Sequence, residues 1–174
     1  AMINDVRALR EPGALDAARD LDVAVCLMHM LGDPRTMQRN PQYDDVVEDV
    51  RAFLVSRAEA CLARGIARER IFIDPGFGFG KTLAHNLFLL SRLERLADTG
   101  YPVLVGMSRK SMLGAMLERS VDERVHGSVA LALIAYLRGA RVIRAHDVEA
   151  TADALEVARR VLEADAADAG SSAS

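Results

Sequence analysis

The sequence lacks the marks of a membrane protein, a disulfide-bonded secreted domain and a dedicated nucleic-acid binder. No apolar run approaches the roughly 18–20 residues of a membrane-spanning helix, and no charged-then-apolar leader is recognised. Two cysteines, Cys26 and Cys61, are too few for a disulfide framework. With 22 basic and 25 acidic residues the formal charge is −3, without the basic surplus of a nucleic-acid binder. We therefore expect a cytoplasmic protein with reduced thiols and no nucleic-acid or membrane partner.

Apolar residues make up 51% of the 174 residues, enough for a real core in about one domain. Five short runs are rich in Val, Ile and Leu. Their continuous rather than alternating apolar character predicts strands that are buried on both faces, as in parallel sheets. The predicted strands are residues 2–6, 23–28, 71–74, 103–106 and 142–144.

Helical patterns separate the predicted strands. In one of them Val46, Val50 and Leu54 recur at helical spacing, and Gly65 suits the C-terminal cap. The helices are predicted at residues 12–20, 44–64, 86–97, 110–118, 122–138 and 147–163. Strand alternating with helix indicates parallel βαβ units, which we assign to one domain over residues 1–163. The small and acidic residues 164–174 have nothing to bury, and we expect a disordered tail.

Hydrogen-bonding or ionisable residues follow every predicted strand. In parallel α/β folds, the positions just after the strand ends line the ligand site. We therefore expect these residues to converge on one site: Asn4 and Asp5, Met28 and His29, the segment 74–82, the segment 106–111, and Arg144 with His146.

The segment Gly76–Thr82 reads Gly-Phe-Gly-Phe-Gly-Lys-Thr and is similar to a phosphate-binding loop. The glycine that such a loop needs five positions before Gly80 is Pro75, and the glycine spacing fits no dinucleotide fingerprint. A flexible connection would explain the glycines but not Asp74, an acid at the end of a buried strand that needs a partner if it is buried. Such a carboxylate could accept paired hydrogen bonds from an amino-pyrimidine edge.

Two basic segments suit anions. Ser108-Arg109-Lys110-Ser111 precedes a short helix whose first amides point outward, which makes an anion site; the alternative is a solvated basic turn. Arg144 and His146 alternate along the last predicted strand, so both side chains should share one face. An Arg with a His there favours a phosphate or pyrophosphate clamp, whereas a lone His at a strand end is often structural.

The other histidines give weaker signals. Cys26 and His29 are three residues apart but of opposite strand parity, and no second pair has suitable spacing, so we do not predict a zinc site. We expect Met28 to serve in pocket or core packing. His85 and His126 are predicted to be surface or cap residues.

Together these segments resemble one family, dihydropteroate synthase, the folate-pathway enzyme that sulfonamides inhibit. The similarity runs from the first residue to about Leu162, and the string Asp-Pro-Gly-Phe-Gly-Phe-Gly-Lys is nearly diagnostic alone. The matching stretches are residues 3–6, 27–30, 74–81, 105–111 and 143–148. The resemblance implies a TIM-type (β/α)8 barrel that joins 4-aminobenzoate to 6-hydroxymethyl-7,8-dihydropterin pyrophosphate and releases pyrophosphate, with Mg²⁺ as cofactor.

The resemblance also implies roles for individual residues. Asn4 and Asp74 would read the hydrogen-bonding edge of the pterin. Lys110 would contact the pterin beside the aminobenzoate ring. Ser111 and the amides at its helix start would bind the aminobenzoate carboxylate. The remaining implied residues are Met28, Phe79 and Gly106 shaping the pocket, and Arg144 with His146 clamping pyrophosphate.

The chemistry implied by the resemblance needs no nucleophile from the protein. An electron-rich pterin can ionise at its exocyclic carbon when the departing pyrophosphate is held and neutralised, and the aminobenzoate amine is nucleophilic without help. The protein then contributes charge stabilisation and positioning, for which we expect Lys110, Arg144 and His146 to be the catalytic groups.

A full barrel takes about 250 residues and eight strands, whereas we predict five here, corresponding to strands four to eight. The resemblance places the family's magnesium ligand outside this portion, so we expect no metal ligand in this chain. An open five-stranded sheet would expose two edges and an apolar face. We therefore expect weak activity at best from the chain alone, and pairing with another chain as a homodimer or other self-association.

Two alternatives stay open. One is a pterin-binding methyltransferase domain, which shares a related barrel, although methyl transfer needs neither the Ser-Arg-Lys-Ser segment nor the Arg-x-His pair. The other is a non-catalytic fragment that binds pterin or a partner chain without turnover.

Overall fold

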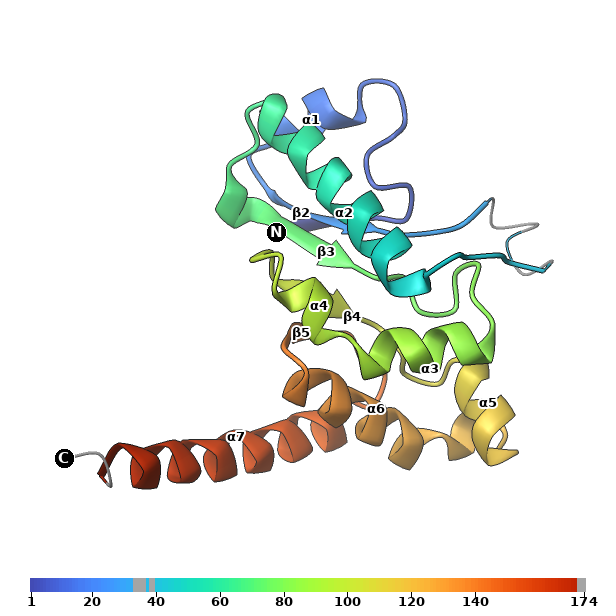
Figure 1. Cartoon of the computed structure of the whole chain (residues 1–174), viewed down its shortest axis with the longest axis vertical. Helices are drawn as coiled ribbons and strands as arrows, with labels where there is room; N and C mark the ends of the chain where they lie inside the picture. Colours follow the sequence, from blue (N-terminus) through green and yellow to red (C-terminus); the bar gives the residue numbers. More distant parts are fainter. Residues whose placement is uncertain (33–36, 38–39, 172–174) are drawn as a thin grey trace.

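Five parallel strands form a single sheet in the order β1-β2-β3-β4-β5 in the computed structural model, which describes residues 1–32, 37 and 40–171. The strands are β1 (Met2–Asp5), β2 (Ala24–Met28), β3 (Ile71–Asp74), β4 (Val103–Val105) and β5 (Ala140–Ile143). The predicted parallel sheet is therefore confirmed. Because all five strands run in one direction, their C-terminal ends meet along one edge, on the right in Figure 1.

Helices connect the strands, and α2, α3 and α4 lie in front of the sheet in Figure 1. The helices are α1 (Ala14–Asp20), α2 (Val46–Ala63), α3 (Leu83–Ser91), α4 (Glu94–Ala97), α5 (Ser111–Leu117), α6 (Val125–Leu137) and α7 (Val148–Ser171). Two short 3-10 turns, η1 (Arg68–Arg70) and η2 (Val121–Glu123), precede β3 and α6. Within the described ranges no helix combines the length and apolar character needed to cross a membrane.

The two faces of the sheet carry different residues. Val25 and Leu27 of β2, and Ile73 of β3, belong to the core that packs under the helices. Because successive side chains in a strand point to opposite faces, Met28 and Asp74 point to the other face, and the register pairs them across β2 and β3. The fold thus places the predicted ligand residues on the face opposite the helices.

Side-chain caps begin two of the helices. Asp45 caps α2 by accepting hydrogen bonds from the backbone N–H groups of Val47 (2.9 Å) and Glu48 (3.2 Å). Thr82 and His85 form a reciprocal capping box at the start of α3. The prediction of His85 as a cap is therefore confirmed, and His126 lies exposed on the surface.

The region predicted as one helix at 86–97 consists of two. α3 starts at Leu83, and between α3 and α4 the N–H groups of Arg92 and Leu93 bond three residues back, to Leu89 and Leu90. This tighter turn rotates the chain so that Leu93 and Leu89 are both fully buried. Packing overrides a continuous α-helix here.

The predicted tail also differs from the structure. α7 continues to Ser171, where we expected disorder from residue 164; residues 172–174 of that prediction lie outside the described residues. Every side chain from Arg159 to Ala167 is exposed, so burial does not explain the helix. Alanine has the highest helix propensity, and Arg159 forms ion pairs with Glu156 and Glu163 one turn away on either side.

Candidate substrate-binding site

Asp74 lies at the centre of the candidate site as a carboxylate with 3% exposure at the end of β3. Its Oδ1 accepts a 2.7 Å hydrogen bond from the backbone N–H of Gly76. Burial raises the pKa of this carboxyl, while that N–H and the cations Lys110, Arg144 and Lys81 act in the opposite direction. The cations that favour the charged form of this acid therefore come from three different loops.

Lys110 lies between this carboxylate and the glycine-rich loop. Its ammonium donates to the carbonyl of Phe77 at 2.5 Å and lies 4.7 Å from the centroid of the Phe79 ring. Burial lowers the pKa of Lys110 to about 8, against the opposing effect of Asp74. A half-buried cation over an aromatic ring thus stands beside the acid.

An open cleft of about 460 Å³ lies beyond the ends of β4 and β5. Its lining residues are Gly106, Ser108, Arg109, Lys110, Val121, Arg144, Ala145 and His146. The predicted clamp residues Arg144 and His146 are both exposed there. The structure therefore brings the expected cations together on one cleft.

The prediction that Arg144 and His146 share one face because they alternate along a strand is wrong. β5 ends at Ile143, so Arg144 and His146 both lie in the loop that follows. Ser108 holds His146 instead: its Oγ accepts from the His146 backbone N–H at 3.2 Å and lies 3.0 Å from the ring Nδ1. A hydroxyl on the neighbouring loop, rather than strand geometry, fixes the imidazole.

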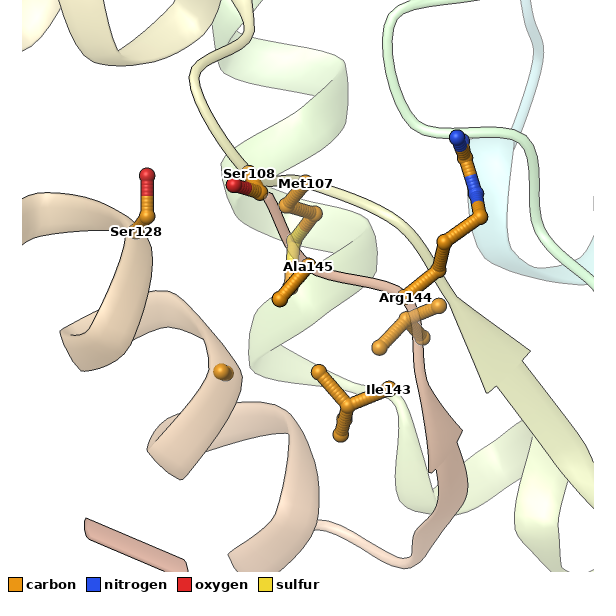
Figure 2. A pocket seen from close by; sticks show the side chains of 8 residues that line it. Met107, Ser108, Ser128, Ile143, Arg144 and Ala145 are labelled. Atoms are coloured by element: carbon orange, nitrogen blue, oxygen red, sulfur yellow. The ribbon is translucent and has the colours of Figure 1, made fainter. Parts of the chain in front are cut away.

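Figure 2 shows the Arg144 side chain extending away from Ile143 and from Ser128 of α6. The Arg144 backbone N–H donates to the Val105 carbonyl at 2.8 Å, which continues the sheet pairing past β5. The guanidinium lies over Gly106, where a Cβ would stand 2.7 Å from Nη2. The absence of a side chain at Gly106 makes room for this cation.

Arg109 does not supply a second free cation to the predicted anion site. Its guanidinium makes two hydrogen bonds to the carboxylate of Asp147, at 2.6 and 3.1 Å, and its backbone adopts a left-handed φ of +58°. Its backbone N–H donates to Ser128 Oγ at 3.0 Å. Arg109 and Asp147 therefore fasten the loop after β4 to the loop after β5, a role that we did not predict.

Of the other predicted residues, some lie beside the glycine-rich loop and some lie further away. Met28 is buried and Phe79 half-buried beside the glycine-rich loop. Asn4 is exposed, and its register with Cys26 sets it two residue positions before the level of Met28 and Asp74. Ser111 is exposed at the start of α5 and lines a separate hollow of about 240 Å³. Their roles stay predictions.

Lys81 and His29 pair in the interior, which the sequence analysis missed. Both are at least 95% buried, and the Lys81 ammonium lies 3.0 Å from His29 Nδ1. Lys81 is therefore not presented to a phosphate, in agreement with the rejection of a phosphate-binding loop. One signal was available: lysine occurs at only two of the 22 basic positions, 81 and 110, and both follow predicted strand ends.

No group of three or more potential ligands among His, Cys, Asp and Glu side chains gathers within the described part of the chain. The residues present do not by themselves fit a Mg²⁺ site, and we derive no chemical step through the metal. Magnesium is commonly bound through substrate phosphates with one or two carboxylates.

Comparison with known families identifies the class of protein. A family model described as pterin binding enzyme matches residues 1–146. The chain therefore belongs to the family of pterin-binding enzymes.

Within that family the chain is a homologue of dihydropteroate synthases. It is 55% identical to the Haemophilus influenzae dihydropteroate synthase over 156 residues, which cover 90% of this chain and 57% of the relative. It is 50% identical to the Escherichia coli K12 dihydropteroate synthase over 163 residues, 94% of this chain and 58% of the relative. The chain thus spans less than three fifths of the length of these relatives, and the family resemblance is confirmed.

Solved structures agree. A Yersinia pestis dihydropteroate synthase with a sulfonamide drug complex matches with a TM-score of 0.91 and 50% identity, over 94% of this chain and 60% of that one. A Xanthomonas albilineans dihydropteroate synthase in complex with 7,8-dihydropteroate matches with a TM-score of 0.86 and 52% identity, over 92% and 60%. The predicted fold, a five-stranded portion of a TIM-type (β/α)8 barrel, is confirmed by these matches.

The His29 imidazole predicts a pH dependence of stability. Burial, with a smaller contribution from Lys81, lowers its pKa to about 3, so between pH 6.5 and 3 the unfolded chain binds a proton that the folded chain does not. The free energy of unfolding should therefore decrease as the pH is lowered from 6.5 to 3, by up to about 1.4 kcal/mol per pH unit from this group. Urea unfolding at several pH values measures it, and His29→Asn should flatten the slope. Identical slopes for both proteins contradict the prediction.

Gly106→Ala should impair anion binding without unfolding the protein. The atoms nearest to the new Cβ all belong to the Arg144 guanidinium, the far end of a long side chain, so we expect the guanidinium to shift while the backbone stays. We expect affinity for inorganic pyrophosphate, measured by calorimetry, to fall at least about fivefold because a charge-assisted hydrogen bond is misaligned. The melting temperature serves as control and should remain near that of the wild type. An unchanged pyrophosphate affinity would show that Arg144 does not bind the anion.

Proposed function

We propose that this protein joins 4-aminobenzoate to 6-hydroxymethyl-7,8-dihydropterin pyrophosphate, giving 7,8-dihydropteroate and pyrophosphate. The observation that carries the proposal is that Lys110 and Arg144, which act electrostatically on the buried Asp74 carboxyl, also line an open cationic cleft. An amine-rich heterocycle suits the carboxylate, and a leaving diphosphate suits the cations. The relatives' names and the ligands of their solved structures support the same assignment.

Asp74 is placed to recognise the heterocycle. One carboxylate oxygen is engaged by Gly76, which leaves the other as an acceptor for N–H groups of the pterin. Phe79 and Lys110 offer a ring and a cation against its flat face. Asn4, Met28 and Gly106 complete the proposed pterin contacts.

The cleft on the β4–β5 side is proposed to hold the leaving group. The bond between the pterin methylene carbon and the pyrophosphate oxygen breaks, and the electron pair departs with pyrophosphate. Arg144, and His146 when protonated or through its N–H, neutralise that charge as it develops, with Lys110 beside them. Mg²⁺ is proposed to enter with the diphosphate.

The second substrate completes the reaction. The amine nitrogen of 4-aminobenzoate attacks the methylene carbon and forms the new C–N bond, and the amine proton passes to solvent or to the departing pyrophosphate. Ser111 at the start of α5 is proposed to bind the carboxylate of this substrate. A Xanthomonas albilineans dihydropteroate synthase, 54% identical over 92% of this chain with a TM-score of 0.87, has been solved with 4-aminobenzoic acid.

Calorimetry followed by a pyrophosphate-release assay tests the function on the 174-residue protein. Binding of pterin pyrophosphate and release of pyrophosphate on addition of 4-aminobenzoate support the synthase. Binding without product indicates a non-catalytic binding module, and preferential binding of a methyl-folate indicates a methyltransferase domain. We expect turnover well below that of a complete synthase.

Asp74→Asn should weaken pterin binding by about 1–3 kcal/mol, which is roughly 5- to 150-fold in Kd. The amide keeps an acceptor for Gly76 but presents N–H donors where the pterin also donates. Calorimetric titration with 6-hydroxymethylpterin measures the change.

Asp5→Asn is the matched control, since Asp5 also ends a strand but bonds only the backbone of its own loop, at Arg7 and Leu9. Equal pterin affinity of wild type and Asp74→Asn would remove Asp74 from the proposed site.

We also propose that a second copy of this chain covers α6 and α7. Ile134 and Leu137 on α6, and Val157 and Val161 on α7, are 41–64% exposed, and α7 projects from the body in Figure 1. α7 packs on α6, and apolar side chains left exposed on the two helices favour association.

Val161→Glu should shift the solution mass, measured by light scattering, from dimer towards monomer, because a charge replaces an apolar contact. Leu21→Glu changes an equally exposed residue beside α1 and is the control. A wild type that is monomeric at all concentrations, or a dimer that Val161→Glu leaves intact, contradicts this placement.

A further inference from the structure

Lys81 is a buried cation to which the proposed reaction gives no part. It retains 3% exposure, and its ammonium has three acceptors around it. These are the carbonyl of Gly76 at 3.0 Å, the carbonyl of Phe79 at 3.1 Å and His29 Nδ1 at 3.0 Å. Burial lowers the pKa of Lys81 to about 7, against the opposing effect of Asp74. In its protonated form the side chain has three N–H donors, and each donor then has an acceptor in a fixed place.

His29 is a fixed acceptor. A protonated Lys81 can only donate to Nδ1, and the ring is then neutral with its proton on Nε2. The ring stands edge-on to Phe53, with centroids 5.1 Å apart, and the His29 backbone N–H donates to the Asp74 carbonyl at 2.9 Å. The imidazole therefore ties Lys81 to the ends of β2 and β3.

The glycine-rich loop held by Lys81 contacts two of the proposed binding residues. The N–H of Gly76 donates to Asp74, and the carbonyl of Phe77 accepts from Lys110, whose ammonium also lies over the Phe79 ring. Lys81 donates to the carbonyls of Gly76 and Phe79, and the Phe79 N–H donates to the same Gly76 carbonyl at 3.0 Å. Asn86 and Tyr43 hold the same loop at Gly78 and Gly80, so release of Lys81 would loosen the loop at Gly76 and Phe79, next to both proposed contacts.

The close packing around position 81 disfavours any other basic side chain there. Gly76 has a φ of +66°, and a Cβ there would lie 1.9 Å from the His29 carbonyl oxygen, so the loop already passes as close to β2 as backbone can. A planar guanidinium matches forked acceptors rather than three acceptors around one nitrogen. Arginine fills 20 of the 22 basic positions of the chain, and lysine stands here and at residue 110.

We propose that Lys81, held by His29, is a positioning residue for pterin recognition: it fixes the Gly76–Gly80 loop so that Asp74, Phe79 and Lys110 meet the heterocycle. The inference rests on the proposed function. The pyrophosphate side is anchored elsewhere, since the backbone N–H groups of Arg144 and His146 donate to β4 and its following loop. Loss of Lys81 should therefore weaken binding of the pterin half of the substrate more than binding of the pyrophosphate half.

Lys81→Met, which keeps an apolar stem and removes the ammonium, tests the proposal in the 174-residue chain. Amide hydrogen exchange reports on the loop, and calorimetry with 6-hydroxymethylpterin and with inorganic pyrophosphate reports on the two halves. We expect faster exchange at Gly78 and Phe79, pterin affinity weaker by at least about tenfold, and a clearly smaller loss of pyrophosphate affinity, because Arg144 and His146 keep their own anchors and only Lys110 is shared by the two halves.

Conservative and control variants separate positioning from general damage. His29→Asn offers an amide oxygen near the place of Nδ1 and should keep most of the pterin affinity, whereas His29→Leu should resemble Lys81→Met. Arg57 likewise holds two backbone carbonyls, those of Ala8 and Leu9 in the loop after β1. Arg57→Met should lower stability without selective loss of pterin affinity.

Three results overturn the inference: pterin affinity of Lys81→Met equal to that of wild type, an equal loss of pterin and pyrophosphate affinity, or the same selective loss in Arg57→Met. When wild type binds pterin and Lys81→Met binds it equally, the inference alone fails. A wild type that binds no pterin rejects the proposed function, and exchange at Gly78 and Phe79 still decides whether Lys81 fixes the loop.

Discussion

The charge of one buried carboxylate constrains the rest of the site. An ion without partners costs several kcal/mol in a protein interior, and Asp74 lies almost fully inside one. The compensating cations come from successive strand ends: Lys81 follows β3, Lys110 follows β4 and Arg144 follows β5. A parallel sheet is what allows this arrangement, because only parallel neighbours bring their C-terminal ends to one edge. Each of the strands β3, β4 and β5 is therefore followed by one cation that acts on Asp74.

Sequence reasoning was sufficient for the sheet and for the general location of the site. Continuous apolar runs predicted all five strands, and Asp74 stood out because an acid at the end of such a run needs a partner. The errors lie where local pattern and packing compete. α3 and α4 are separated by a tight turn that buries Leu93, and α7 extends past residue 163 because alanine favours helix even without burial.

The pairings over the edge of the sheet were beyond sequence reasoning. His29 and Lys81 are 52 residues apart, and Arg109 and Asp147 are 38 apart. Neither pair follows from a period or a cap, since each depends on which loops meet and on how one backbone turns, as at the left-handed Arg109. The one sequence signal for the buried pair was the use of lysine in place of arginine at residue 81. Lysine's compact ammonium suits a buried position with several acceptors, whereas arginine's fork suits carboxylates such as that of Asp147.

The candidate site is divided by exposure as well as by charge. On the β2–β3 side Met28, His29 and Asp74 are buried, whereas on the β5 side Arg144 and His146 are open to solvent. Desolvation strengthens hydrogen bonds to a neutral heterocycle and makes a mismatched edge costly. The same desolvation would oppose the build-up of negative charge on the leaving diphosphate, which water stabilises by hydration. A site that excludes water from the recognised ring and admits it to the leaving group therefore serves both steps of the proposed reaction, and Gly106 and Lys110 mark the boundary between the two environments.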